Sequence, residues 1–222
     1  MEQTPAHELH NPELLELMPP NAPRIVEVGC STGAMAREYK RRNPNCRYIG
    51  IEIVPRYAEL ARRYCDSVHE LDIEGVTEAG IRESMMGDCW VFGDALEHLK
   101  DPWELLGKIR RALPSSGCVV ACIPNAQHWS LQARLNSGDW AYEESGLLDK
   151  THLRWFTRQT IIEMFERTGF RIEAGLTRTF GHPQRDRVLA GIRSMAQATG
   201  SDPERAVADA LPLQYVLRAI PA

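Results

Sequence analysis

Short apolar segments alternate with amphipathic segments of about ten residues along most of this chain. The apolar segments have the length and β-branched content of buried strands, whereas the others repeat apolar residues at helical spacing. Strands are predicted at residues 24–28, 47–53, 67–72, 89–93, 117–123, 170–174 and 214–220. Helices are predicted between them, at about residues 34–42, 56–65, 77–86, 103–113, 157–168 and 186–199.

Strands and helices in this order form a parallel sheet, because each right-handed crossover places a helix on one face. We therefore predict an α/β fold: a doubly wound, mostly parallel seven-stranded sheet with helices on both faces and an antiparallel last strand. We expect a leader at residues 1–23 and one domain at residues 24–222. Residues 124–156 break the pattern, and a loop of that length usually serves as a lid or binding segment. Residues 181–212 give the weakest signal, and their helix either packs on the sheet or forms a dimer surface.

The composition excludes several classes of protein. With 43% hydrophobic and 25% charged residues, the sequence is typical of a globular domain. Its six cysteines include no CxxC pair, so free thiols in a reducing compartment are expected. No apolar run is long enough to span a membrane, and the N-terminus lacks the regions of a secretory signal. We therefore expect a cytoplasmic protein, and the net charge of -4 argues against a nucleic-acid partner.

Acidic residues and glycines gather in the turns that follow the predicted strands. In open parallel sheets, ligands bind beyond the carboxyl ends of the strands, where the strand order reverses. The first turn, Glu27–Gly33, lacks the endings and spacing of phosphate and dinucleotide loops, which disfavours a pyrophosphate ligand. Its acid suits a ligand with an amino group, and Glu52 can accept both hydroxyls of a ribose. A nucleoside joined to an amino acid fits both features.

These turns, together with Asp72 and the stretch Val91–Leu99, resemble those of class I S-adenosylmethionine-dependent methyltransferases. Three further stretches are similar to a bacterial subgroup often found beside glycosyltransferases in surface-polysaccharide clusters: Ile123–Asn125, His128–Trp129 and Leu148–Thr157. The resemblance covers about residues 24–174. It implies a Rossmann-like methyltransferase fold and S-adenosylmethionine as the cofactor, with S-adenosylhomocysteine as its product.

The resemblance also implies a set of cofactor-binding residues. Glu27 and Gly29 would contact the methionine portion, Glu52 the ribose, Asp72 with Ile73 the adenine, and Gly93 with Asp94 the floor beneath the sulfonium. The complete set is Glu27, Gly29, Cys30, Ser31, Gly33, Glu52, Ile53, Asp72, Ile73, Gly93 and Asp94. Ser31 departs from the family pattern, which usually has Gly there. We expect it to fit the turn with a negative φ and to point its hydroxyl toward the methionine carboxylate.

A hydroxyl acceptor must lose its proton during methyl transfer, so a general base is expected near the carboxyl edge of the sheet. Imidazole titrates near neutrality, and the candidates are His98, His128 and His152. We prefer His98, which lies one helical turn after Asp94. The lid also carries three tryptophans that suit a sugar ring or a planar acceptor: Trp129, Trp140 and Trp155. We expect O-methylation of a carbohydrate or another small hydroxylated acceptor, and a homodimer remains open.

Two alternatives remain. The segment Asp94-x-x-Glu97-His98, with the later His152, is a plausible divalent-metal set and resembles that of small-RNA 2′-O-methyltransferases. Position 94 is Asp rather than Glu, and no basic tract accompanies it, so we expect no metal. The second alternative is a catalytically inert cofactor-binding module, since a fold does not settle function. In that case the cofactor would bind without turnover, and Ser31 would be a sign of drift. Separately, the alternative role for the histidines is a hydrogen bond to a loop, and for the tryptophans a cluster that anchors the lid.

Overall fold

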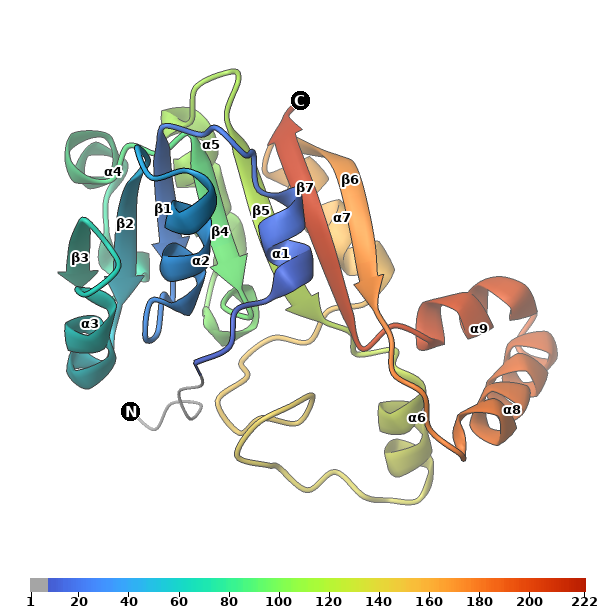
Figure 1. Ribbon diagram of the computed structural model, residues 1–222. Coiled ribbons are helices and arrows are strands. Elements are labelled where there is room, and N and C mark those ends of the chain that lie inside the picture. The colour runs from blue at the N-terminus through green and yellow to red at the C-terminus, as the bar shows by residue number, and fades with distance from the viewer. Residues whose placement is uncertain (1–7) are drawn as a thin grey trace.

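A seven-stranded sheet runs through the centre of residues 8–222, the part of the chain that the computed structural model describes (Figure 1). Its strand order is β3-β2-β1-β4-β5-β7-β6. The strands are β1 Arg24–Val28, β2 Arg47–Glu52, β3 Ser67–Glu70, β4 Cys89–Gly93, β5 Cys118–Pro124, β6 Phe170–Arg178 and β7 Gln214–Pro221. Strand β7 is antiparallel to both of its neighbours, and the other pairings are parallel. The predicted mostly parallel sheet with a reversed last strand is confirmed.

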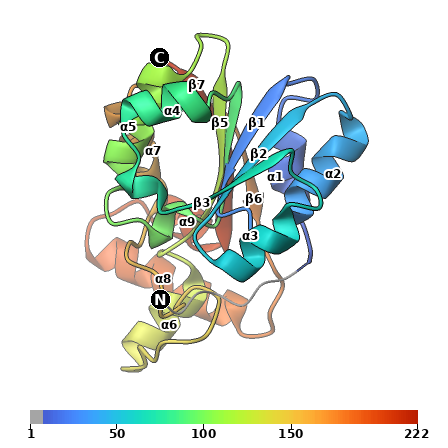
Figure 2. The ribbon, with the colours of Figure 1, turned by 90° about the vertical axis from the view of Figure 1, so that its left-hand side faces the viewer.

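Helices cover both faces of the sheet, as predicted. One face carries α1 Pro12–Leu17, α2 Ala34–Arg42 and α3 Pro55–Ala61, and the other carries α4 Glu78–Ser84, α5 Pro102–Ala112 and α7 Arg158–Arg167 (Figure 2). The central strands read as continuous apolar runs because they are buried on both sides. On β1, Ile25 faces the α1–α3 layer, whereas Val26 and Val28 face the α4, α5 and α7 layer. This is a doubly wound, Rossmann-like arrangement.

Helix α1 lies within the segment expected to be a polar leader. Asn11 caps it by accepting a hydrogen bond from the Leu14 backbone N–H at 3.0 Å. Leu14 and Leu15 are buried in the same apolar cluster as α2 and β1. The helix therefore belongs to the core of the domain, although its six residues are too few to give a clear periodic signal.

Three helices form a separate layer beyond the carboxyl edge of the sheet: α6 Trp129–Asn136, α8 Arg185–Ala198 and α9 Pro203–Ala210. Helix α8 was predicted within one residue at each end, whereas α6 and α9 were not predicted. Both begin at side-chain caps, His128 and Asp202. Trp129, Leu189 and Ala210 pack together between the three helices, so this layer has its own small apolar core.

The fully buried side chain of Asn125 joins this layer to the end of β5. Its Nδ2 donates to the carbonyls of Asp209 and Pro212, each at 2.8 Å, and its Oδ1 accepts from the Gln127 N–H at 2.9 Å. The beginning of the lid is therefore fixed to the end of α9 and to the chain that follows it. No helix within residues 8–222 is long and apolar enough to cross a membrane.

Candidate active site

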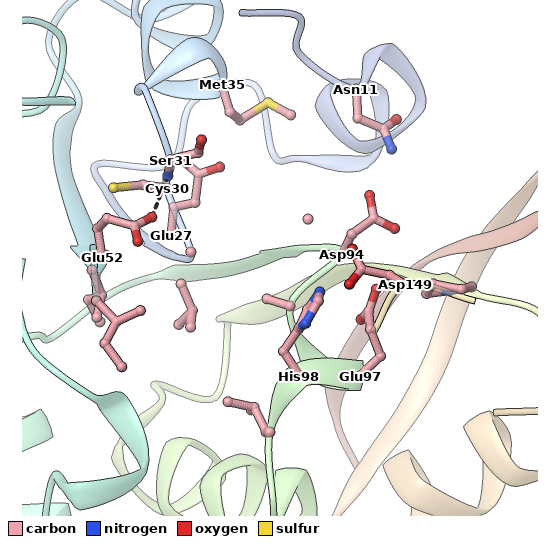
Figure 3. A pocket seen from close by; sticks show the side chains of 18 of the residues that line it. Asn11, Glu27, Cys30, Ser31, Met35, Glu52, Asp94, Glu97, His98 and Asp149 are labelled. Carbon is pink, nitrogen blue, oxygen red and sulfur yellow. Dashed lines mark hydrogen bonds between the residues drawn. The ribbon is translucent and has the colours of Figure 1, made fainter. Parts of the chain in front are cut away.

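A cavity of about 660 Å³ opens at the carboxyl ends of β1 and β4, where the strand order reverses (Figure 3). Its size is that of a site for a small molecule. The predicted site residues that line it are Glu27, Gly29, Cys30, Ser31, Glu52, Ile53, Asp72, Ile73, Gly93, Asp94, His98 and His152. Among the described residues, Gly33 and His128 do not belong to this lining. The chain thus brings the turns after four strands and one part of the lid to a single cavity.

Backbone hydrogen bonds attach the turn after β1 to the end of β2. The N–H groups of Gly29 and Cys30 donate to the Ile51 carbonyl at 2.9 and 3.1 Å. Gly29 and Gly33 have φ values of +71° and +79°, in the left-handed region that favours glycine. A Cβ on Gly33 would lie 3.1 Å from the Ala61 Cα, so this glycine allows α2 to approach α3 rather than touching a ligand.

Ser31 does not have the negative φ that we expected. Its φ is +48°, a conformation that costs a residue with a Cβ roughly 1–2 kcal/mol. The Ser31 N–H donates to Oε2 of Glu52 at 2.8 Å, which holds the turn in this shape. The other residue besides glycine with a positive φ in residues 8–222 is Asp94, at +54°, on the opposite wall of the cavity. Such conformations concentrate at ligand sites.

We expect Ser31→Gly to raise the free energy of unfolding by about 1 kcal/mol, because glycine adopts a positive φ without the Cβ clash. The measurement is the midpoint of urea unfolding. Ser31→Ala is the matched control: it removes the hydroxyl but keeps the Cβ, so it should bring no such gain. A less stable Ser31→Gly protein would show that the serine side chain itself supports the turn.

Glu52 lies at the end of β2 and has one backbone donor on each carboxylate oxygen. Ser31 N–H donates to Oε2 at 2.8 Å, and Val54 N–H donates to Oε1 at 2.9 Å. The residue is buried yet lines the cavity. An ionised carboxylate has about four lone-pair sites, so two remain for hydroxyl groups of a ligand. The two backbone bonds fix their direction in advance.

Glu27 is a buried carboxylate, and Tyr48 is its hydrogen-bond donor at 2.9 Å. Burial raises the pKa of Glu27 to about 8, against the opposing effect of the Tyr48 hydroxyl, and the charge of Glu52 adds to the rise. Such a group holds a proton at neutral pH unless a cation arrives beside it. A ligand ammonium group would supply that cation.

The third and fourth turns complete this half of the cavity. Asp72 caps the short 3-10 helix η1 Ile73–Gly75 by accepting from the Glu74 N–H at 3.0 Å. Ile73 is buried and Ile53 is exposed, and both give the cavity an apolar lining. After β4, a Cβ on Gly93 would lie 3.3 Å from Leu14 of α1, so the glycine makes room for that helix.

A polar cluster forms the opposite wall. Glu97 lies on the 3-10 helix η2 Leu96–His98 and is 1% exposed. Within residues 8–222, neither of its carboxylate oxygens has a hydrogen-bond partner. Burial raises its pKa well above the usual range, and the charges of Asp94 and Asp149 raise it further. Figure 3 shows the carboxylates of Glu97 and Asp149 beside the ring of His98, with that of Asp94 nearby on the side of Asn11.

The rings of His98 and His152 meet edge to face in this cluster, with their centroids 4.8 Å apart. Nδ1 of His98 lies 3.2 Å from the carbonyl and 3.0 Å from the hydroxyl of Thr151. Burial lowers the pKa of His98, and burial together with the neighbouring His98 lowers the pKa of His152 to about 4. Both rings are therefore neutral at pH 7. Nε2 of His152 lies 4.0 Å from Oε1 of Glu97.

Comparison with known families decides what kind of protein carries this site. A family model described as a methyltransferase domain matches residues 4–174. The chain belongs to this methyltransferase family. A search of the curated proteins finds no match.

Solved structures agree with this fold. An S-adenosylmethionine-dependent methyltransferase from Mesorhizobium loti is 16% identical, with 94% of this chain and 96% of that chain covered and a TM-score of 0.61. One from Archaeoglobus fulgidus is 18% identical, with coverage of 89% and 85% and a TM-score of 0.60. Magnesium protoporphyrin IX methyltransferase from Synechocystis, solved with bound SAH, is 9% identical, with coverage of 91% and 76% and a TM-score of 0.59. At these identities the likeness concerns the fold alone.

The methyltransferase domain does not bring all three predicted histidines together. His128 lies outside the cavity and caps α6: its Nδ1 lies 2.7 Å from the Ser130 hydroxyl, and burial lowers its pKa to about 4. The geometry favours a structural role for it. The three lid tryptophans are also absent from the described lining of the cavity. Trp129 packs between His128 and His182, at centroid distances of 5.2 and 5.3 Å, so the expected aromatic wall does not form.

Other lining residues of the methyltransferase were missed by sequence reasoning. Asn11, Asp149, Arg178 and Gln214 reach the cavity from α1, the lid, β6 and β7. Gln214 Nε2 donates to Oδ1 of Asp94. The Nδ2 group of Asn11 is buried without a hydrogen-bond partner in the described chain, and it points toward the Asp94 side of the cavity (Figure 3). Asp149 could have been found from the sequence, since it is close in the chain to the candidate base His152. The other three residues reach the cavity only through tertiary packing, which no local sequence pattern shows.

Proposed function

We propose that this methyltransferase uses S-adenosylmethionine to methylate a hydroxyl group on a carbohydrate or another small acceptor. The observation that carries the cofactor assignment is the pair of buried carboxylates, Glu27 and Glu52, on one side of a single cavity. The acceptor assignment rests on the polar cluster of the opposite wall and on the resemblance to the bacterial subgroup found beside glycosyltransferases.

The residues fit this cofactor group by group. Glu27 is a buried carboxyl group, and no cation within residues 8–222 is among the groups that shift its pKa. It would bind the ammonium group of the methionine portion. Glu52 would accept from the ribose hydroxyls with the lone pairs that Ser31 and Val54 leave open. Ile53 and Ile73 would hold the adenine between apolar surfaces, beside Asp72.

S-adenosylmethionine supplies a methyl carbon on a positively charged sulfur, which an oxygen nucleophile attacks as the carbon–sulfur bond breaks. The protein's part is alignment, and positioning of two reactants can contribute up to roughly 7–11 kcal/mol. Gly93 and Asp94 line the cavity after β4 and would lie beneath the sulfonium. His98 and His152 line the cavity and are neutral at pH 7, so either ring would be able to accept the hydroxyl proton of an acceptor.

The acceptor side suits a small molecule with several hydroxyl groups. Asp94, Asp149 and the two histidines offer acceptors for such groups, and Arg178 and Lys100 also line the cavity. The runner-up, a metal-assisted RNA 2′-O-methyltransferase, shares the same polar cluster. The net charge of -4 makes an RNA strand the less suitable partner.

The direct test is transfer of a labelled methyl group from S-adenosylmethionine to a panel of free sugars, glycosides, amines and a short RNA. We expect label on the sugars, in an ether bond that survives mild alkali. A carboxyl methyl ester would be lost under the same treatment. Label on amines or RNA alone would contradict the acceptor assignment. Binding of S-adenosylhomocysteine without transfer to any acceptor would favour the inert module.

A further inference from the structure

Glu97, His98 and His152 bring three metal-ligating side chains to one point on the cavity wall. One ligand atom from each lies within 4.8 Å of the others. Glu97 and His98 are adjacent on η2, whereas His152 belongs to the lid, more than fifty residues later in the chain. All three line the same cavity; Glu97 and His152 are buried, and His98 is half-buried.

The carboxylate of Glu97 provides an independent observation. It is 1% exposed, and within residues 8–222 neither of its oxygens accepts a hydrogen bond. Its nearest basic group is Nε2 of His152, at 4.0 Å, which is too far for a hydrogen bond. A carboxylate buried in this way is costly unless a cation compensates its charge. Figure 3 shows it pointing into the cluster, between His98 and Asp149.

The ring of His98 is held in the manner of a metal ligand. Its Nδ1 donates toward the Thr151 carbonyl at 3.2 Å, which leaves Nε2 with its lone pair. Histidines that bind metals usually donate their second ring N–H to a carbonyl or carboxylate, and this bond sets the tautomer. The Thr151 hydroxyl in turn donates to Oδ1 of Asp149 at 2.6 Å. Thr151 and Asp149 thus orient the ring from outside the cluster.

The distances suit a single ion. Three ligand atoms spaced evenly at about 2.2 Å from one ion lie at most about 3.8 Å apart, so side-chain shifts of about 1 Å or less would gather atoms now within 4.8 Å. Two imidazoles and one carboxylate are a mixed nitrogen and oxygen set, which favours a divalent first-row transition metal over Mg²⁺ or Ca²⁺. Such a set also leaves coordination positions open.

We propose that Glu97, His98 and His152 bind a divalent transition-metal ion such as Mn²⁺, with its open positions directed to the acceptor side of the cavity. There the ion would hold a hydroxyl oxygen of the acceptor and favour loss of its proton, a task that His98 and His152 could not perform as bases once they bind the ion. The role toward the acceptor rests on the proposed function, whereas binding of the ion does not. The sequence argued against a metal because position 94 is Asp rather than Glu, but these three groups meet without help from Asp94.

The first experiment measures binding of Mn²⁺ alone to the full chain after treatment with a chelator, through the electron paramagnetic resonance signal of the free ion. We expect one ion per chain. Glu97→Gln and His152→Ala should each weaken binding at least about 10-fold. His182→Ala is the matched control, since His182 lies beside Trp129 and outside the cluster, and it should bind Mn²⁺ as the wild type does.

Thermal unfolding of the variants shows whether weaker Mn²⁺ binding results from a lost ligand or from a misfolded protein. The apo form of Glu97→Gln should unfold at or above the wild-type temperature, because the variant removes an uncompensated buried acid. Mn²⁺ should raise the unfolding temperature of the wild type and not that of the variant. Absence of saturable binding, or equal binding by wild type and both cluster variants, would overturn the proposal.

Calorimetry with S-adenosylhomocysteine separates this inference from the proposed function. If S-adenosylhomocysteine binds and methyl transfer to sugars is unaffected by the chelator, the proposed role of the ion toward the acceptor is wrong, and the proposed function stands. Saturable Mn²⁺ binding without binding of S-adenosylhomocysteine would overturn the proposed function alone. We expect S-adenosylhomocysteine binding to survive the chelator, and methyl transfer to be lost with it and restored by Mn²⁺.

Discussion

Glu52→Gln should weaken binding of S-adenosylhomocysteine roughly 100-fold. The carboxylate accepts one backbone N–H on each oxygen, from Ser31 and from Val54. An amide has only one oxygen, so its NH₂ group would face one of these donors and leave it unpaired. The variant also loses the charge that strengthens hydrogen bonds to ribose hydroxyls. Hydrogen bonds to charged groups contribute about 1.5–3 kcal/mol each, and about 1.4 kcal/mol corresponds to a tenfold change in affinity.

The measurement is isothermal titration calorimetry at constant pH. Glu70→Gln is the matched control: Glu70 faces Glu52 across the β2–β3 pairing but does not belong to the described lining of the cavity. It should bind as the wild type does. If Glu52→Gln folds and also binds S-adenosylhomocysteine normally, Glu52 only supports the turn, and the ribose must be held elsewhere.

The second large effect is a pH dependence that originates at Glu27. Its pKa is about 8, raised mainly by burial, so the free protein carries a proton there below this pH. An ammonium group binds to the carboxylate form, and the proton must leave when the ligand arrives. Affinity for S-adenosylhomocysteine should therefore rise about tenfold per pH unit between pH 5.5 and 7.5. Titrations in buffers of different ionisation enthalpy should show release of nearly one proton.

The proton on Glu27 has the opposite effect on the stability of the free protein, which should decrease with rising pH while ligand affinity increases. Because the folded pKa lies above the unfolded value, the folded state binds the extra proton, and the free energy of unfolding should fall as pH rises from about 4.5 to about 8. Glu27→Gln should remove both dependences. Tyr48→Phe removes the hydrogen bond that opposes the rise in pKa, and should move the dependence to higher pH. Affinity that is flat between pH 5.5 and 7.5 would contradict the role assigned to Glu27.

The fold was predictable because apolar periodicity reports burial directly. β4 and β5 are covered on both faces, and their uninterrupted apolar runs mark them as interior parallel strands. Helices α6 and α9 were missed for the same physical reason. Each has eight residues and buries only one or two of them, in a layer away from the sheet, so the apolar pattern is weak.

The site was predictable where it consists of strand ends, since parallel strands bring their carboxyl ends to one edge. The side-chain details were not. The sign of φ at Ser31 depends on how the turn packs against Glu52, and no local pattern gives it. The assignment of His128 to the cavity ignored its position before α6, where a cap is the simpler use of the ring. The meeting of His98 with His152 depends on the path of the lid.

Strand β7 follows β6 in the chain but lies between β5 and β6 in the sheet. A ribosome therefore completes β6 before the strand that must separate it from β5 exists. During biosynthesis, β6 cannot pair with the sheet until β7 has been synthesised. The hydrogen bond from Gln214 to Asp94 also forms only after β7 has joined the sheet. One wall of the cavity is thus assembled after the turns that follow β1 and β2 have been translated. The turns on the Glu27 and Glu52 side of the cavity are therefore synthesised well before the wall to which β7 contributes.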